Sequence, residues 1–89
     1  MPTGKIRTII RTERFQQEMN RIEPDVRRAD EFLEGAETIL AREPDSGYAL
    51  QGSSVWFVPG HTVDLSLFYT FDEDYVHFLS IKKVTPPSL

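Results

Sequence analysis

The chain has 89 residues, of which 39% are hydrophobic and 11% aromatic, a length and composition that fit one packed domain. Its net charge of −4, from 10 Lys and Arg against 14 Asp and Glu, argues against a general attraction to nucleic acid. Because cysteine is absent and no stretch is apolar enough for a signal peptide or a membrane span, we expect a cytoplasmic protein without disulfides, thiolate metal sites or membrane association.

The first elements in chain order are a short strand and a helix. The segment "KIRTIIRT" is rich in Ile and Thr, which favours a strand. Thr12 can then cap a helix in which Phe15, Met19 and Ile22 recur at the spacing of one buried stripe. Proline disfavours a helical conformation in the residue before it, so we expect this helix to end or to kink at Pro24.

A second amphipathic helix is predicted to follow Pro24, since proline and acidic residues are both favoured in a first helical turn. Its apolar stripe consists of Val26, Ala29, Leu33, Ala36 and Leu40, widened by Phe32 and Ile39. Pro44 and the two glycines of "REPDSGYALQGSS" then end the helix. The two segments together are expected to form an amphipathic helical hairpin, or one long helix kinked at Pro24.

The second half of the chain has the character of strands. Residues 55–58 are a short apolar run, and residues 62–71 and 75–84 are longer runs joined by the polar turn Asp72-Glu73-Asp74. The predicted order is therefore β-α-α-β-β-β, an α+β fold with the helical hairpin packed on one face of a small, mainly antiparallel sheet. We predict a single domain over residues 1–89, with flexible ends at 1–4 and 85–89.

The two long strands can be divided by face, because alternate residues of a strand point in opposite directions. The face expected to pack on the helices contains Val63, Leu65, Leu67, Tyr69, Phe71, Leu79 and Ile81. The open face is expected to carry Asp64, Ser66, Phe68, Thr70, Val76, Phe78, Ser80 and Lys82, with Trp56 or Phe57 from the preceding strand. Such a half-aromatic surface is expected to be covered in part by a partner, a ligand, the C-terminal tail or the second copy of a homodimer.

No metal or cofactor site is predicted. His61 and His77 are too few and too far from a third ligand to bind a metal. The acids of the turn at 72–74 lack the ligand spacing of a calcium loop. Ser53-Ser54 lacks the glycine frame of a catalytic serine turn, so we expect no hydrolase of that kind.

The order of these segments resembles the RelE/ParE-like toxins of bacterial type II toxin–antitoxin modules, with this chain as a divergent or degenerate member. The matching segments are the opening strand, "TERFQQEMNRIEPDVRRADEFLEGAETIL" as the helical hairpin, "AREPDSGYALQG" as the connection, and "LSLFYTFDEDYVHFLSIKK" as paired strands that end in basic residues. The resemblance implies the fold described above, an antitoxin encoded nearby, and a target that is either another protein or the ribosome with its mRNA.

Members of this family that cut messenger RNA on the ribosome are similar in placing basic residues on the open face of the sheet. Cations there hold the phosphate as charge builds during cleavage. On this pattern Lys82 and Lys83 are the candidate catalytic residues. Ser66 stands where the cleaving members usually have an arginine, and the last residues, "VTPPSL", lack the tyrosine or histidine that often follows the last strand.

Two kinds of function follow as alternatives. In the first, the chain is a toxin-like component that binds an antitoxin and a cellular target, or a non-toxin interaction module on the same scaffold. The predicted binding surface consists of Trp56, Ser66, Phe68 and Phe78, with Arg7 and Arg11 from the adjacent edge. In the second, the chain is a ribosome-dependent mRNA endoribonuclease in which Lys82 and Lys83 grip phosphate, helped by Lys5, Arg7 or Arg11. The missing arginine and tyrosine favour binding without cleavage.

Overall fold

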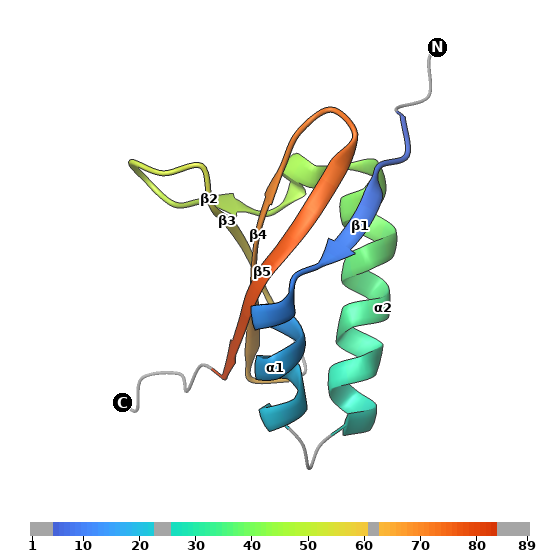
Figure 1. Ribbon diagram of the computed structural model, residues 1–89, viewed down its shortest axis with the longest axis vertical. Coiled ribbons are helices and arrows are strands. Elements are labelled where there is room, and N and C mark those ends of the chain that lie inside the picture. The colour runs from blue at the N-terminus through green and yellow to red at the C-terminus, as the bar shows by residue number, and fades with distance from the viewer. Residues whose placement is uncertain (1–4, 23–25, 61–62, 84–89) are drawn as a thin grey trace.

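The computed structural model describes residues 5–22, 26–60 and 63–83, whose elements are labelled in Figure 1. In chain order these are β1 (Thr8–Arg11), α1 (Glu13–Ile22), α2 (Val26–Arg42), a short 3-10 helix η1 (Pro44–Ser46), β2 (Tyr48–Ala49), β3 (Trp56–Pro59), β4 (Leu65–Phe71) and β5 (Tyr75–Lys83). The predicted order is confirmed, with β2 as a short additional strand in the segment predicted to be a connection. Three predictions fall outside the described residues. They concern the helix break at Pro24, the loop residue His61, and the flexible ends at 1–4 and 85–89.

The five strands form one mixed sheet in the order β1-β5-β4-β3-β2. The strand β1 pairs with β5 in parallel, and the other three pairs are antiparallel. Because β1 precedes the two helices and β5 is the last strand, their pairing joins the two ends of the described chain. The predicted α+β fold, with two helices on a mainly antiparallel sheet, is therefore confirmed (Figure 1).

The helix α1 begins at the predicted cap. Thr12 Oγ1 accepts a hydrogen bond from the backbone N–H of Phe15 at 3.3 Å and donates one to the carbonyl of Phe78 at 2.7 Å. The same hydroxyl thus starts α1 and fixes it to β5. Figure 1 shows the result, with β1 beside one half of β5 and α1 beside the other. Neither α1 nor α2 is long and apolar enough, in the part that the structure describes, to cross a bilayer.

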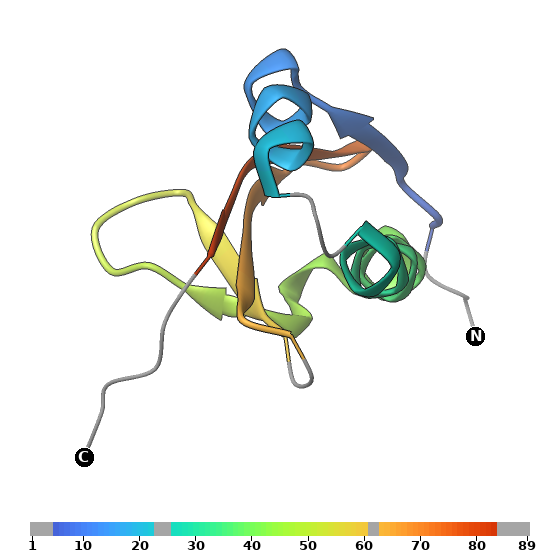
Figure 2. The ribbon, with the colours of Figure 1, turned by 90° about the horizontal axis from the view of Figure 1, so that it is seen from below.

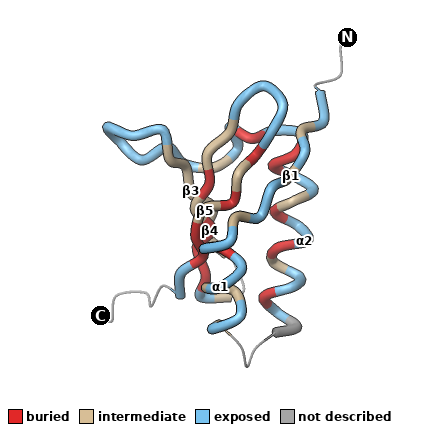
Figure 3. The backbone as a smooth tube through the Cα atoms, viewed as in Figure 1, coloured by how far each residue is buried: buried red, intermediate tan, exposed pale blue. Residues whose placement is uncertain are grey.

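The core lies between the helices and one face of the sheet. On α2 the buried positions recur along the side that faces the strands (Figure 3). The fully buried large side chains are Tyr69, Phe15, Phe78, Leu33, Leu40, Leu67, Ile81 and Val76. Tyr69 also donates a 2.6 Å hydrogen bond to the carbonyl of Pro44, and burial raises the pKa of this phenol to about 12. The predicted stripes are confirmed, except at Ile39, which is 54% exposed, and at Val26, whose side chain lies outside the described part.

One predicted face assignment is wrong, because β5 contains a β-bulge. Phe68 pairs with Ser80 and Tyr69 pairs with Phe78, so Leu79 is an extra residue in β5. The bulge reverses the alternation of β5 on its N-terminal side. Val76 and Phe78 therefore point into the core, although strict alternation predicts both on the open face, and Leu79 is only half buried.

Candidate functional site

The end of β5 carries the two lysines proposed from the sequence as catalytic. Lys82 pairs across the sheet with Ser66, and Lys83 pairs with Leu65. Ser66 is buried and uncharged, whereas the Lys82 side chain is 48% exposed. The Lys82 ammonium lies 2.5 Å from the carboxylate of Glu18 in α1. The charge of the main catalytic candidate is thus already balanced by an acid of the same chain.

Glu18 of α1 accepts hydrogen bonds at the edge of β5, in the part of that strand where β1 no longer pairs with it. The parallel strand β1 ends at Arg11, opposite Phe78, and α1 continues along the same edge. There Glu18 Oε1 accepts hydrogen bonds from the Ile81 N–H at 3.2 Å and from Ser80 Oγ at 2.6 Å. These contacts satisfy backbone and hydroxyl groups that would otherwise face an open sheet edge.

The carboxyl group of Glu18 is strongly acidic. Its partial burial raises the pKa, but hydrogen bonds from Lys82, Ser80 and the backbone of Ile81 outweigh this effect and lower the pKa to about 2. Arg14 Nε lies 3.6 Å from Glu18 Oε2 and adds a second cation. Near neutral pH, Glu18 is therefore ionised and remains the counter-ion of Lys82.

The predicted helper cations from the β1 edge also contact acceptors. Arg7 Nε donates to the carbonyl of Asp72 at 2.7 Å, and Arg11 Nε donates to Glu37 at 2.8 Å. Lys5 forms an ion pair with Asp74. Since β1 pairs only with residues 75–78 of β5, Arg7 lies toward the opposite end of that strand from Lys82. These cations hold the 72–74 turn and α2 and do not assemble around Lys82.

The open face of the sheet carries a row of aromatic rings, formed by Tyr48, Phe57 and Phe68. The ring centres of Tyr48 and Phe57 lie 5.4 Å apart, and those of Phe57 and Phe68 lie 6.0 Å apart. This aromatic row crosses β2, β3 and β4, and Ser80 continues it on β5. The predicted place of Phe68 on the open face is confirmed.

Two other members of the predicted binding surface lie elsewhere. Phe78 is 0% exposed and packs against Phe15 with ring centres 5.4 Å apart, so its predicted role at the surface is wrong. Trp56 pairs with the buried Tyr69 and contacts Phe71 on the face that carries the core. Of the two candidates from β3, Phe57 is therefore the one on the open face.

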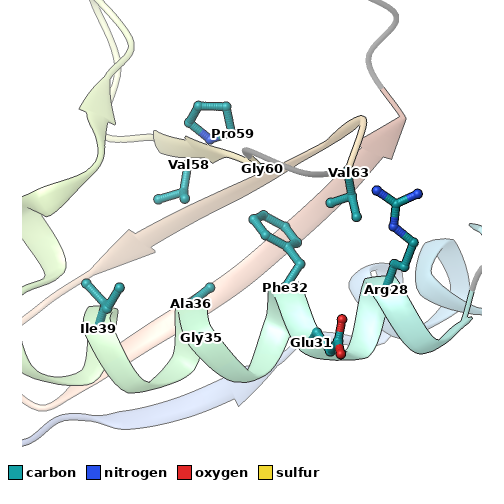
Figure 4. A pocket seen from close by; sticks show the side chains of 10 residues that line it. All are labelled: Arg28, Glu31, Phe32, Gly35, Ala36, Ile39, Val58, Pro59, Gly60 and Val63. Atoms are coloured by element: carbon teal, nitrogen blue, oxygen red, sulfur yellow. The ribbon is translucent and has the colours of Figure 1, made fainter.

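A groove that the sequence did not predict runs between α2 and β3. It consists of two adjoining cavities of about 310 and 250 Å³, which share Ala36, Ile39, Val58 and Pro59. Figure 4 shows the larger cavity, where Phe32, Ala36 and Ile39 of α2 face Val58 and Val63. Pro59 also lines this cavity, although its ring points away from α2. Arg28 and Glu31 lie at one end, and Ser46, Gly47 and Tyr48 line the smaller cavity. We call this surface the α2–β3 groove.

Gly35 lines this groove on the α2 side and has no side chain to fill it. A Cβ atom added at Gly35 would meet nothing within 4 Å, so core packing does not require glycine there. Glycine inside a helix costs about 1 kcal/mol relative to alanine. Ile39, one turn further along α2, is 54% exposed although it is a large apolar residue. The part of α2 that contains Gly35 and Ile39 is therefore open to solvent along the groove.

The described residues contain no group of three His, Cys, Asp or Glu side chains that could hold a metal ion. His77 Nε2 lies 3.8 Å from Oδ2 of Asp72. The pKa of Asp72 is lowered mainly by hydrogen bonds from the backbone of Asp74 and Tyr75. This acid organises the turn between β4 and β5.

No protein-family model matches the sequence, and no curated protein matches it. Solved structures do match over most of their length. The RelBE2 toxin–antitoxin complex of Mycobacterium tuberculosis matches with a TM-score of 0.69 and 21% identity over 86% of this chain and 90% of that one. The chromosomal ParDE system of P. aeruginosa matches with a TM-score of 0.71 and 12% identity, over 92% of this chain and 100% of that one. The E. coli RelBE complex matches with a TM-score of 0.67 and 19% identity, over 89% of this chain and 98% of that one. The chain therefore has the RelE/ParE-like toxin fold.

Proposed function

We propose that this chain is the toxin-like component of a toxin–antitoxin module, and that it acts by binding an antitoxin and a cellular target without cleaving RNA. The likeness to toxin–antitoxin complexes supports the module. The contact between Lys82 and Glu18 is the observation that supports binding without RNA cleavage.

Cleavage of RNA through its 2′-hydroxyl requires a base, cations that hold the phosphate, and an acid for the leaving oxygen. Lys82, the candidate cation on the open face, is balanced by a carboxylate whose pKa is about 2. Ser66, at the position where an arginine is expected in a cleaving member, is buried and carries no charge. Among the residues that the structure describes, the open face thus lacks a cationic centre, without a counter-ion of its own, that would stabilise the developing charge.

The α2–β3 groove is the proposed site for the antitoxin. Its walls are mostly apolar, and Ile39 and Tyr48 remain exposed along it. An amphipathic helix or an extended segment of an antitoxin can place apolar side chains in such a groove. Phe57 and Phe68 of the aromatic row, on the other face of the sheet, then stay available for the cellular target, since aromatic residues dominate the energetics of many protein interfaces.

Co-expression with the proteins encoded by the genes adjacent to its own tests this proposal. We expect one of these proteins to form a complex that survives purification, and we expect the chain to slow growth only when that partner is absent. The proposal would be wrong if no adjacent product bound the chain and its expression alone left growth unchanged.

A further inference from the structure

The two carboxylate oxygens of Glu18 make different kinds of contact. Oε1 accepts the hydrogen bonds of Ser80 and Ile81 and so attaches α1 to β5. Within the described part of the chain, Oε2 contacts two cations, with Lys82 Nζ at 2.5 Å and Arg14 Nε at 3.6 Å. The Glu18 side chain is 15% exposed, whereas those of Lys82 and Arg14 are 48% and 70% exposed. Two accessible cations therefore share one largely covered anion.

We propose that Glu18 is an internal counter-ion that prevents the end of β5 from binding nucleic-acid phosphate. A phosphate oxygen that contacts both Lys82 and Arg14 would lie beside Glu18 Oε2, and the negative charge of the carboxylate would repel it. Without the charge of Glu18, the end of β5 and the adjacent turn of α1 would present Arg14 and Lys82 without a shared counter-ion. Glu18 thus selects against nucleic acid as a ligand, independently of the partner proposed above.

The charge of Glu18 can be removed while its structural contacts are kept. In Glu18→Gln the amide oxygen can still accept from Ser80 and Ile81, and the amide nitrogen, which is a donor, faces Lys82 and Arg14. Glu37→Gln is the matched control, because it changes the net charge equally and releases Arg11 instead. Glu18→Gln combined with Lys82→Met removes the released cation but keeps an apolar side chain of similar length.

Binding of a single-stranded RNA oligonucleotide, measured at several salt concentrations, distinguishes these variants. Each phosphate neutralised on a single strand adds about 0.7 to the steepness of log K against log salt. We expect Glu18→Gln to bind the RNA about 10-fold more tightly than the wild type does at low salt. We also expect its plot of log K against log salt to be steeper by about 0.7 to 1.4, which corresponds to one or two additional phosphate contacts. We expect Glu37→Gln and the double variant to behave like the wild type.

An equal gain in Glu37→Gln would show that only net charge matters, and a gain that persists in the double variant would show that Lys82 is not involved. Either result would overturn the proposal. Lys82→Met in the wild-type background adds a test that does not require Glu18→Gln to fold. It should weaken RNA binding no more than Arg11→Met, which lowers the net charge equally and leaves Glu37 without its cation. A clearly larger loss of RNA binding in Lys82→Met than in Arg11→Met would mean that Glu18 does not block this cation.

Discussion

Replacement of Phe78 with alanine is expected to lower the free energy of unfolding by about 3–5 kcal/mol, the usual cost of removing a buried aromatic side chain. Phe78 is 0% exposed, and its ring packs against that of Phe15, with centres 5.4 Å apart. A loss of this size is a large part of the total stability of a small domain, about 5–15 kcal/mol. Chemical denaturation followed by circular dichroism measures it directly.

Phe68→Ala is the matched control for Phe78→Ala. The same atoms are removed from the same residue type, but Phe68 lies on the open face and is only partly buried. We expect this variant to lose about 1 kcal/mol, typical of a substitution outside the core. Equal losses in the two variants, or a larger loss in Phe68→Ala, would mean that the bulge at Leu79 does not set the faces as described.

Local sequence patterns predicted the elements but could not place the bulge. The cap at Thr12 and the stripes of both helices depend on residues a few positions apart. The cap is confirmed, and so are the stripes at their described positions, except at the exposed Ile39. In "YVHFLSIKK", however, Val76 and Phe78 form one alternating apolar set, and Leu79 and Ile81 form another. A strand without a bulge can bury only one set, and a shift of one residue exchanges the faces. The presence of both sets was the signal of a bulge.

The candidate site depended on contacts that no local pattern contains. Glu18 and Lys82 are 64 residues apart, so the neutralisation of Lys82 became visible only when α1 was placed on the edge of β5. The α2–β3 groove likewise requires the position of a helix relative to a strand. Its one local signal was Gly35, an isolated glycine inside a helical pattern.

Ile39→Glu is expected to weaken binding of the proposed antitoxin by about 100-fold, equivalent to about 2.7 kcal/mol. Ile39 lines both cavities of the α2–β3 groove and is 54% exposed in the free chain. A carboxylate there stays hydrated in the free protein, so folding should be little affected. It loses that hydration when apolar side chains of the partner cover the groove, and burial of an unpaired charge is costly. Isothermal titration calorimetry with the purified partner measures the change.

Thr38→Glu is the control for Ile39→Glu. It introduces the same negative charge one residue earlier in α2, at an exposed position that does not line the groove. We expect its affinity for the partner to stay within about threefold of the wild type, because a rim charge contributes less than about 1 kcal/mol. Similar losses in both variants would indicate a general effect of charge, and unchanged affinity in Ile39→Glu would place the antitoxin outside the groove.

The function proposed for this chain is binding without RNA cleavage, and the most direct test is to incubate the purified protein with translating ribosomes and map the ends of the mRNA. We predict that the transcripts remain intact at every protein concentration, with the wild type and with Lys82→Ala alike, because Glu18 balances the charge of Lys82. Cleavage of the mRNA by the wild type, at defined positions and lost in Lys82→Ala, would contradict the proposed function.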